Sequence, residues 1–133
     1  MNQDFLQEFV KSREDPVYFM STYIKVTHPV RGLVPFNLYP FQENIVNSLE
    51  SNGFNVLRKF RQAGCTTIAG AYSLHFTNFN KHKTVVILSK GDTESTEVLD
   101  RIKIMHDELP SWLKQPITES NKHTLKFKNG SMI

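Results

Sequence analysis

Residues 59–67, Lys-Phe-Arg-Gln-Ala-Gly-Cys-Thr-Thr, have types and spacing that suit phosphate chemistry. A phosphate-binding loop reads Gly, four residues, then Gly-Lys-Ser/Thr, and it joins a strand to a helix. Its backbone N–H groups hold phosphate oxygens and its hydroxyl binds magnesium. Gly64 stands where the second glycine belongs, and Thr66 stands at the hydroxyl position. The loop therefore predicts a site for nucleotide phosphates with Mg²⁺.

Two positions depart from that pattern, because Lys59 replaces the first glycine and Cys65 replaces the lysine. The Cys65 thiol is neutral and its thiolate would repel phosphate, so the missing cation needs another source. Lys59 is the candidate, with Arg61 as a second cation. A charge-assisted contact contributes about 1.5–3 kcal/mol, against about 0.3–1 kcal/mol for a helix terminus. From the residues alone, an ordinary capped helix start with Cys65 as a space-filler remains the alternative.

The elements around this loop follow from hydrophobic spacing, caps and breakers. The predicted helices cover residues 4–13, 16–26, 40–49, 66–79 and 92–109. The predicted strands cover residues 54–60, 84–88 and 124–128, and Asn129-Gly130 predicts a hairpin turn. Residues 84–88 form a continuous apolar run, as in a strand buried within a parallel sheet. This order predicts an α/β fold of the P-loop NTPase type, a mostly parallel sheet with flanking helices.

The expected organisation is a helical lead-in over residues 1–36, followed by the front part of a P-loop ATPase domain over residues 37–133. Only three residues follow the Asn129-Gly130 turn. We therefore expect a sheet that is incomplete at the C-terminus, in a domain truncated before its Walker B strand.

Composition sets wide bounds on the class of protein. The net charge of +3 and the pI near 9.0 permit nucleic-acid contact without singling it out. A single cysteine excludes an internal disulfide, and the five histidines lack metal-ligand spacing. No apolar run approaches membrane-spanning length, so we expect a soluble protein inside the cell.

Residues 61–67 resemble the Arg-Gln-x-Gly-Lys-Thr-Thr loop of tailed-phage terminase large subunits. Further stretches are similar to T-even-type terminases in the same order, namely residues 15–19, 28–32, 38–42, 98–103 and 109–113. Lambda-type terminases carry Lys-Ser-Ala-Arg-Val-Gly-Tyr-Ser, which has lysine first and none after the glycine. Residues 59–66 match that placement, and the resemblance covers nearly the whole chain.

The resemblance implies the N-terminal ATPase of a motor that packages viral double-stranded DNA into a procapsid. It implies ATP and Mg²⁺ as cofactors. The implied partners are double-stranded DNA, the portal protein, the small terminase subunit and further copies in a homo-oligomeric ring, with no membrane. The implied location is the host cytoplasm, transiently on the procapsid.

The resemblance also implies residue roles. Arg61 and Lys59 would be catalytic through charge at the γ-phosphate, Thr66 would bind magnesium, and Gln42 would read adenine. The implied nucleotide-binding set is Phe41, Gln42, Lys59, Arg61, Gln62, Ala63, Gly64, Cys65, Thr66 and Thr67. Judged without the loop, Gln42 is also explained as a polar residue on an amphipathic helix.

The chain departs from the terminase pattern because no apolar run ends in Asp-Glu. The Walker B carboxylate and the catalytic glutamate are missing, so we expect ATP hydrolysis in the intact protein and not in this fragment. Two alternatives stay open. One is a helicase-like nucleic-acid-dependent ATPase, and the other is a non-catalytic module with a degenerate loop.

Overall fold

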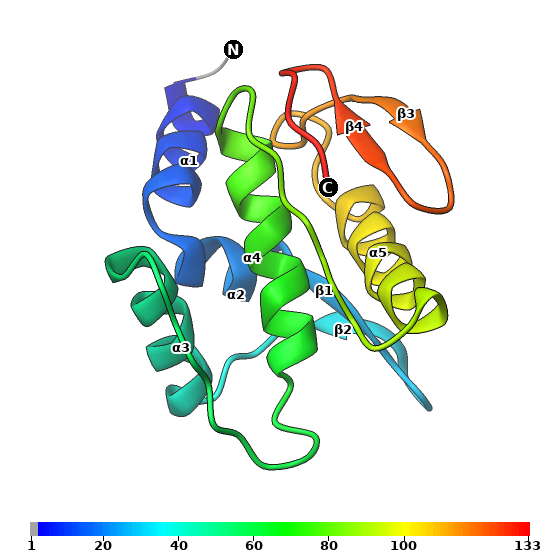
Figure 1. Ribbon diagram of the computed structural model, residues 1–133. Helices are drawn as coiled ribbons and strands as arrows, with labels where there is room; N and C mark the ends of the chain where they lie inside the picture. Colours follow the sequence, from blue (N-terminus) through cyan, green and yellow to red (C-terminus); the bar gives the residue numbers. More distant parts are fainter. Residues whose placement is uncertain (1–2) are drawn as a thin grey trace.

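The computed structural model describes residues 3–133, so residues 1 and 2 of the predicted lead-in lie outside the described part. Helix α4 is central in the molecule (Figure 1) and packs against α2, α3 and α5. The elements are α1 (Gln3–Glu14), α2 (Pro16–Tyr23), β1 (Lys25–His28), β2 (Gly32–Pro35), α3 (Pro40–Ser51), α4 (Cys65–Phe79), α5 (Asp92–Asp107), β3 (Ile117–Ser120) and β4 (Leu125–Phe127).

The helices start where the sequence places their caps. Asp15 precedes α2, and its side chain accepts a hydrogen bond from Tyr18 N at 3.1 Å, while Pro16 occupies the first helical position. Pro40 opens α3 in the same way. The five predicted helices match α1 to α5, except that α2 ends at Tyr23.

The difference at α2 arises from a hairpin that the helical pattern concealed. Strand β1 pairs antiparallel with β2, with Val26 opposite Val34 and Thr27 opposite Leu33. β-Branched side chains pack well across such pairs and gain less in a helix. Gly32 (φ 73°) supplies the left-handed residue at the turn. The hairpin then packs against α5 through β1.

The predicted α/β fold of the P-loop NTPase type is wrong for this structure. Within residues 3–133 the sheets are two separate antiparallel pairs, β1–β2 and β3–β4. Residues 54–60 and 84–88 do not form the predicted strands, because the first segment runs as a plain tube along α3 and the second runs between α4 and α5 (Figure 1). Several of their apolar side chains face solvent, since Phe54 is 98% exposed and Leu88 is 89% exposed, whereas Val85 and Ile87 pack partly against the core. An apolar run predicts burial, but it does not specify which neighbouring strand supplies the backbone hydrogen bonds, and neither run gains a full partner strand here.

The C-terminal residues come closest to the predicted parallel pairing. Met132 N donates to Lys83 O and Val85 N donates to Met132 O, both at 2.9 Å, and Thr84 forms a parallel bridge with Met132. On its other side, the segment at residues 131–133 bonds with β4 after the predicted turn, where Gly130 has φ 86°. The predicted strand at residues 124–128 and its hairpin turn are thus present, as β4 and a three-residue return.

One apolar cluster fills the space around α4. It comprises Phe19, Met20, Ile24, Phe36, Val46, Ile68, Ala71, Leu74, Leu99, Ile102, Met105, Leu109, Leu113, Leu125, Phe127 and Ile133. Gly70 lets α5 approach closely, because a Cβ there would lie 3.2 Å from Ile102 Cγ1. In the described residues, no helix combines the length and apolar content needed to cross a bilayer.

Buried polar groups tie the helices together. His75 Nε2 lies 2.9 Å from Ser12 O, and because a carbonyl only accepts, the ring carries its proton on Nε2. Burial lowers the pKa of His75 and, in the same way, that of His106, whose Nε2 donates to Gln115 O at 2.7 Å. Burial therefore favours the neutral form of both rings.

Candidate functional site

The predicted phosphate loop leads into α4 through a turn with left-handed backbone. Gly64 is the N-cap residue with φ 80° and ψ 13°, and Gln62 has φ 62°. A non-glycine residue in that region costs about 1–3 kcal/mol, and such residues cluster at functional sites. At Gly64, a Cβ would lie 2.7 Å from Gln42 Nε2. The loop thus requires glycine at this position both for its φ and for the close approach of Gln42.

Gln42 holds the loop against α3. Its Nε2 donates to Ala63 O at 3.1 Å, and its Oε1 accepts from Tyr39 N at 2.9 Å. The second bond is the reciprocal half of a capping box at the start of α3. The side chain is 5% exposed. The predicted contact of Gln42 with adenine stays a prediction, and both ends of its amide are engaged within the protein.

Three cationic side chains lie in the loop or directly before it. Arg58, Lys59 and Arg61 are all exposed, and no ion pair in the described residues includes any of them. The N-terminus of α4 adds a partial positive charge from its free N–H groups. Among residues 3–133 no carboxylate lies within ion-pair distance of these three cations, so the loop favours an anion.

An aromatic surface adjoins the cations. The Tyr39 and Phe41 rings are nearly parallel, with 6° between their planes and centroids 6.0 Å apart, and Phe60 lies 5.7 Å from Phe41. Tyr39 and Phe60 are each 65% exposed. A cavity of about 210 Å³ opens beside these rings, lined by Phe41, Ile45, Leu57, Arg58, Lys59, Phe60, Ala63 and Cys65. The structure thus brings Phe41, Lys59, Ala63 and Cys65 of the predicted set to one cavity.

The two predicted threonines do not share that cavity. Thr66 is exposed on the first turn of α4. Thr67 lines a second cavity of about 370 Å³, together with Lys25, Val26, Thr27, Arg101, Ile104 and Met105. Across residues 3–133, no group of three or more His, Cys, Asp or Glu side chains is placed to hold a metal ion. The N–H groups and cations at the loop thus suit an anion. They do not form a metal site made of protein carboxylates.

Sequence reasoning gave no role to Tyr39, Arg58 or Phe60. A usable signal was present, because residues 57–61 read Leu-Arg-Lys-Phe-Arg, an interleaving of apolar and cationic side chains. Residues 54–60 were predicted to form a short strand before the loop, and no role was given to the Phe60 ring. In the structure Phe60 lies on the surface and completes the aromatic group.

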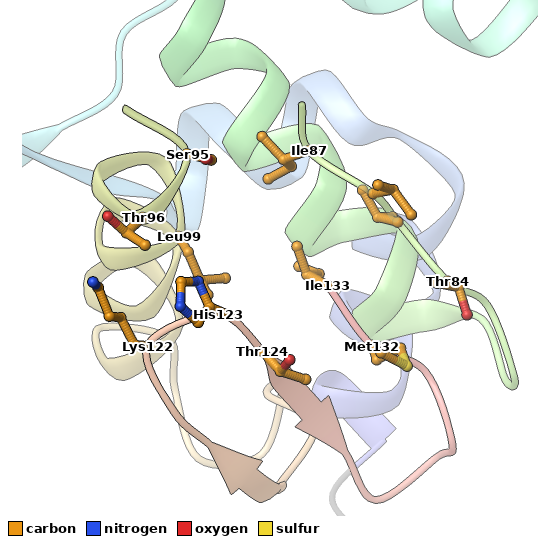
Figure 2. A pocket seen from close by; sticks show the side chains of 12 residues that line it. Thr84, Ile87, Ser95, Thr96, Leu99, Lys122, His123, Thr124, Met132 and Ile133 are labelled. Carbon is orange, nitrogen blue, oxygen red and sulfur yellow. The ribbon is translucent and has the colours of Figure 1, made fainter. Parts of the chain in front are cut away.

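A third cavity, of about 240 Å³, lies on the other side of the fold, between residues 84–87, the start of α5 and the turn before β4. Figure 2 shows Ile87, Leu99 and Ile133 around it, with Lys122 and His123 at one side. It contains none of the predicted site residues.

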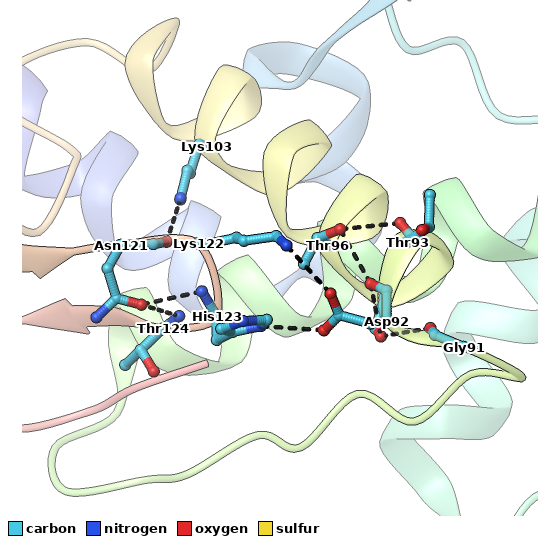
Figure 3. Close-up of polar contacts among 10 residues, drawn as sticks. Gly91, Asp92, Thr93, Thr96, Lys103, Asn121, Lys122, His123 and Thr124 are labelled. Carbon is cyan, nitrogen blue, oxygen red and sulfur yellow. Dashed lines mark hydrogen bonds and ion pairs between the residues drawn. The ribbon is translucent and has the colours of Figure 1, made fainter.

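An ion-pair cluster fastens the turn before β4 to α5 (Figure 3). Asp92 lies 3.2 Å from Lys122 Nζ and 3.4 Å from His123 Nδ1, and Lys103 Nζ donates to Asn121 O at 2.6 Å. These side chains are exposed, and surface pairs of this kind contribute about 0–1 kcal/mol. We therefore assign the cluster a structural role.

The loop, the cations and the aromatic rings are therefore the strongest functional feature of the described chain. No known protein-family model matches the sequence.

Proposed function

We propose that this chain binds the phosphates of a nucleotide at the loop before α4, as the nucleotide-binding part of a terminase large subunit. In the intact protein this is the ATP-driven motor that packages double-stranded DNA into procapsids. The observation that carries the proposal is the left-handed turn at Gly64, which opens α4 beneath three cations that have no ion-pair partner among residues 3–133.

Each component of the loop has a chemical task. The N–H groups of the first turn of α4 donate to phosphate oxygens, which needs no side chain and explains why Cys65 is tolerated there. Lys59 and Arg61 balance the charge of the outer phosphates from the exposed side of the loop. Tyr39, Phe41 and Phe60 offer faces for a base. The groups assigned in this proposal thus come from the start of α3, the loop and the first turn of α4.

The magnesium ion would enter with the nucleotide. Thr66 supplies one hydroxyl, and the remaining oxygen ligands come from phosphate and water, as is usual for Mg²⁺. When bound, the ion neutralises phosphate charge during hydrolysis. No apolar run of the sequence ends in Asp-Glu, so we assign turnover to the intact motor, where double-stranded DNA, the portal protein, the small subunit and a ring of copies are the expected partners.

Titration with a fluorescent ATP analogue in the presence of Mg²⁺ tests the site. We expect saturable binding by the wild-type chain and a dissociation constant that rises about 10- to 100-fold in Lys59→Ala, the size of one charge-assisted contact. Lys81→Ala is the matched control, because Lys81 is an exposed lysine on the connector after α4 and should leave binding unchanged. Cys65→Lys should bind at least as well as the wild type.

Two results would overturn the proposal. Absence of any saturable signal from the wild-type chain would favour a non-catalytic module with a degenerate loop. Equal losses in Lys59→Ala and Lys81→Ala would mean that the effect is non-specific charge. In the intact motor, Lys59→Ala should also abolish ATP-driven DNA packaging.

A further inference from the structure

We infer that the site holds the base of its nucleotide by stacking and apolar contact alone, so that it accepts ATP and GTP with similar affinity. This inference rests on the proposed function, because it concerns the base of the nucleotide whose phosphates the loop binds. It assigns Gln42 a positioning task and gives recognition of the base to Phe41 and Phe60.

The first step is the state of Gln42, the side chain that the resemblance to terminases assigns to adenine. Its Nε2 is committed to Ala63 O and its Oε1 to Tyr39 N, at 3.1 and 2.9 Å. Reading adenine takes a donor and an acceptor together, and turning the amide toward a base would break both of these hydrogen bonds. The side chain is also 5% exposed, which leaves little surface for a ligand.

The second step is the wall of the cavity beside the rings. Phe41, Ile45, Leu57, Phe60 and Ala63 contribute carbon surface, and Cys65 contributes a weak donor. Arg58 and Lys59 also line the cavity and are exposed, and long cationic side chains commonly lay their stems on apolar surface with the charged end in water. Both purines present the same N7 acceptor, so a cation near the base does not demand adenine.

The third step concerns selectivity. A site that hydrogen-bonds a ligand group rejects the analogue lacking it by about 10⁴–10⁵, whereas an apolar pocket distinguishes similar ligands by about 10–200-fold at most. Stacking on aromatic rings tolerates every base, because each has a π face. Phe60, with centroid 5.7 Å from Phe41 and ring 65% exposed, is free to close on a base beside Phe41. Stacking and apolar contact therefore give the site no strong preference between the two purines.

Gln42 acts on the nucleotide through the loop. It joins Ala63, in the phosphate loop, to Tyr39, the residue that caps α3 and stacks on Phe41. Gln42→Ala removes both hydrogen bonds, so the phosphate loop and the aromatic surface are no longer joined. Affinity for ATP and for GTP should then fall by the same factor, and the ratio between them should not move.

Competition titrations against a fluorescent nucleotide test this with ATP, GTP and inorganic tripolyphosphate, all with Mg²⁺. For the wild type we expect ATP and GTP dissociation constants within about threefold, as for a site that reads no base edge. Phe60→Ala should weaken both about 5- to 100-fold and leave tripolyphosphate unchanged. Phe54→Ala, a 98% exposed aromatic outside the cavity, is the control and should change nothing. Gln42→Ala should weaken both nucleotides equally.

A preference for ATP above tenfold that disappears in Gln42→Ala would overturn the inference, because Gln42 would then be reading adenine. Equal affinities for ATP and tripolyphosphate would also overturn it, since the base would contribute nothing. If neither nucleotide nor tripolyphosphate binds, the proposed function itself fails. Because Phe60 is on the surface, its variant should keep the wild-type unfolding midpoint, which separates lost stacking from lost folding.

Discussion

Replacing Gly64 by alanine should destabilise the protein more than the same change at any exposed, unstrained glycine. Two separate costs arise at this position. The left-handed φ of 80° costs about 1–2 kcal/mol once a Cβ is present. The new Cβ would also lie 2.7 Å from Gln42 Nε2 and displace it from Ala63 O, which costs about 0.5–1.5 kcal/mol more. The expected loss in the free energy of unfolding is therefore about 1.5–3.5 kcal/mol.

Two other glycines separate these costs. Gly32 has φ 73° with nothing within 4 Å of a Cβ, so Gly32→Ala should show the backbone cost alone, about 1–2 kcal/mol. Gly53 has neither a left-handed φ nor a close neighbour, so Gly53→Ala should be neutral or stabilising by at most about 1 kcal/mol.

Urea unfolding followed by circular dichroism measures all three variants against the wild type. The expected order of destabilisation is Gly64→Ala, then Gly32→Ala, then Gly53→Ala. A Gly64 variant no less stable than the Gly32 variant would refute the close approach of Gln42. A Gly64 variant as stable as the Gly53 variant would refute the left-handed turn as well.

Two further predictions concern buried polar groups. Asn129→Ala should lower the free energy of unfolding by about 1–3 kcal/mol, because the Asn129 amide donates to Thr77 O at 2.8 Å and to Asn80 O at 3.1 Å. Urea unfolding measures the loss, with Asn37→Ala at an exposed position as the control. Equal losses in the two variants would contradict the prediction. Burial lowers the pKa of His75 below 6.5, the ordinary pKa of histidine. Below pH 6.5 the unfolded chain therefore binds a proton that the folded chain does not, and the free energy of unfolding should fall. Unfolding measured from pH 8 to 5 should show a shallower fall in His75→Gln, and an unchanged slope would count against a buried neutral ring.

The helices were predictable because their determinants are local. Asp15-Pro16 and Pro40 each act on the turn that follows them, and Gly64 acts on the first turn of α4. The same locality explains the Asn129-Gly130 turn. Sheet pairing depends on partners far along the chain, which the apolar run at residues 84–88 does not specify. The parallel sheet was therefore predicted from an incomplete pattern, and the structure replaces it with two antiparallel pairs.

The loop was predictable in part. Its glycine and its cations follow from residue type and spacing, and the structure shows the left-handed turn that such a glycine permits. The position of Gln42 was not predictable, because the sequence shows a Gln on the first turn of a helix but not the carbonyl 21 residues away that it binds. The contribution of Phe60 was missed because residues 54–60 were predicted to form a strand, and the structure shows no strand there.

The pairing between Met132 and residues 83–85 has a consequence for synthesis on the ribosome. Ser131 Oγ accepts from Lys83 N across 48 positions of sequence, and the neighbouring backbone bonds span similar separations. At about 5–20 residues per second, roughly 2–10 s pass between the appearance of these two segments. During that interval α1 to α4 can already form from local contacts, while the apolar residues after α4 have no partner. This stretch is then the part of the nascent chain most open to a chaperone.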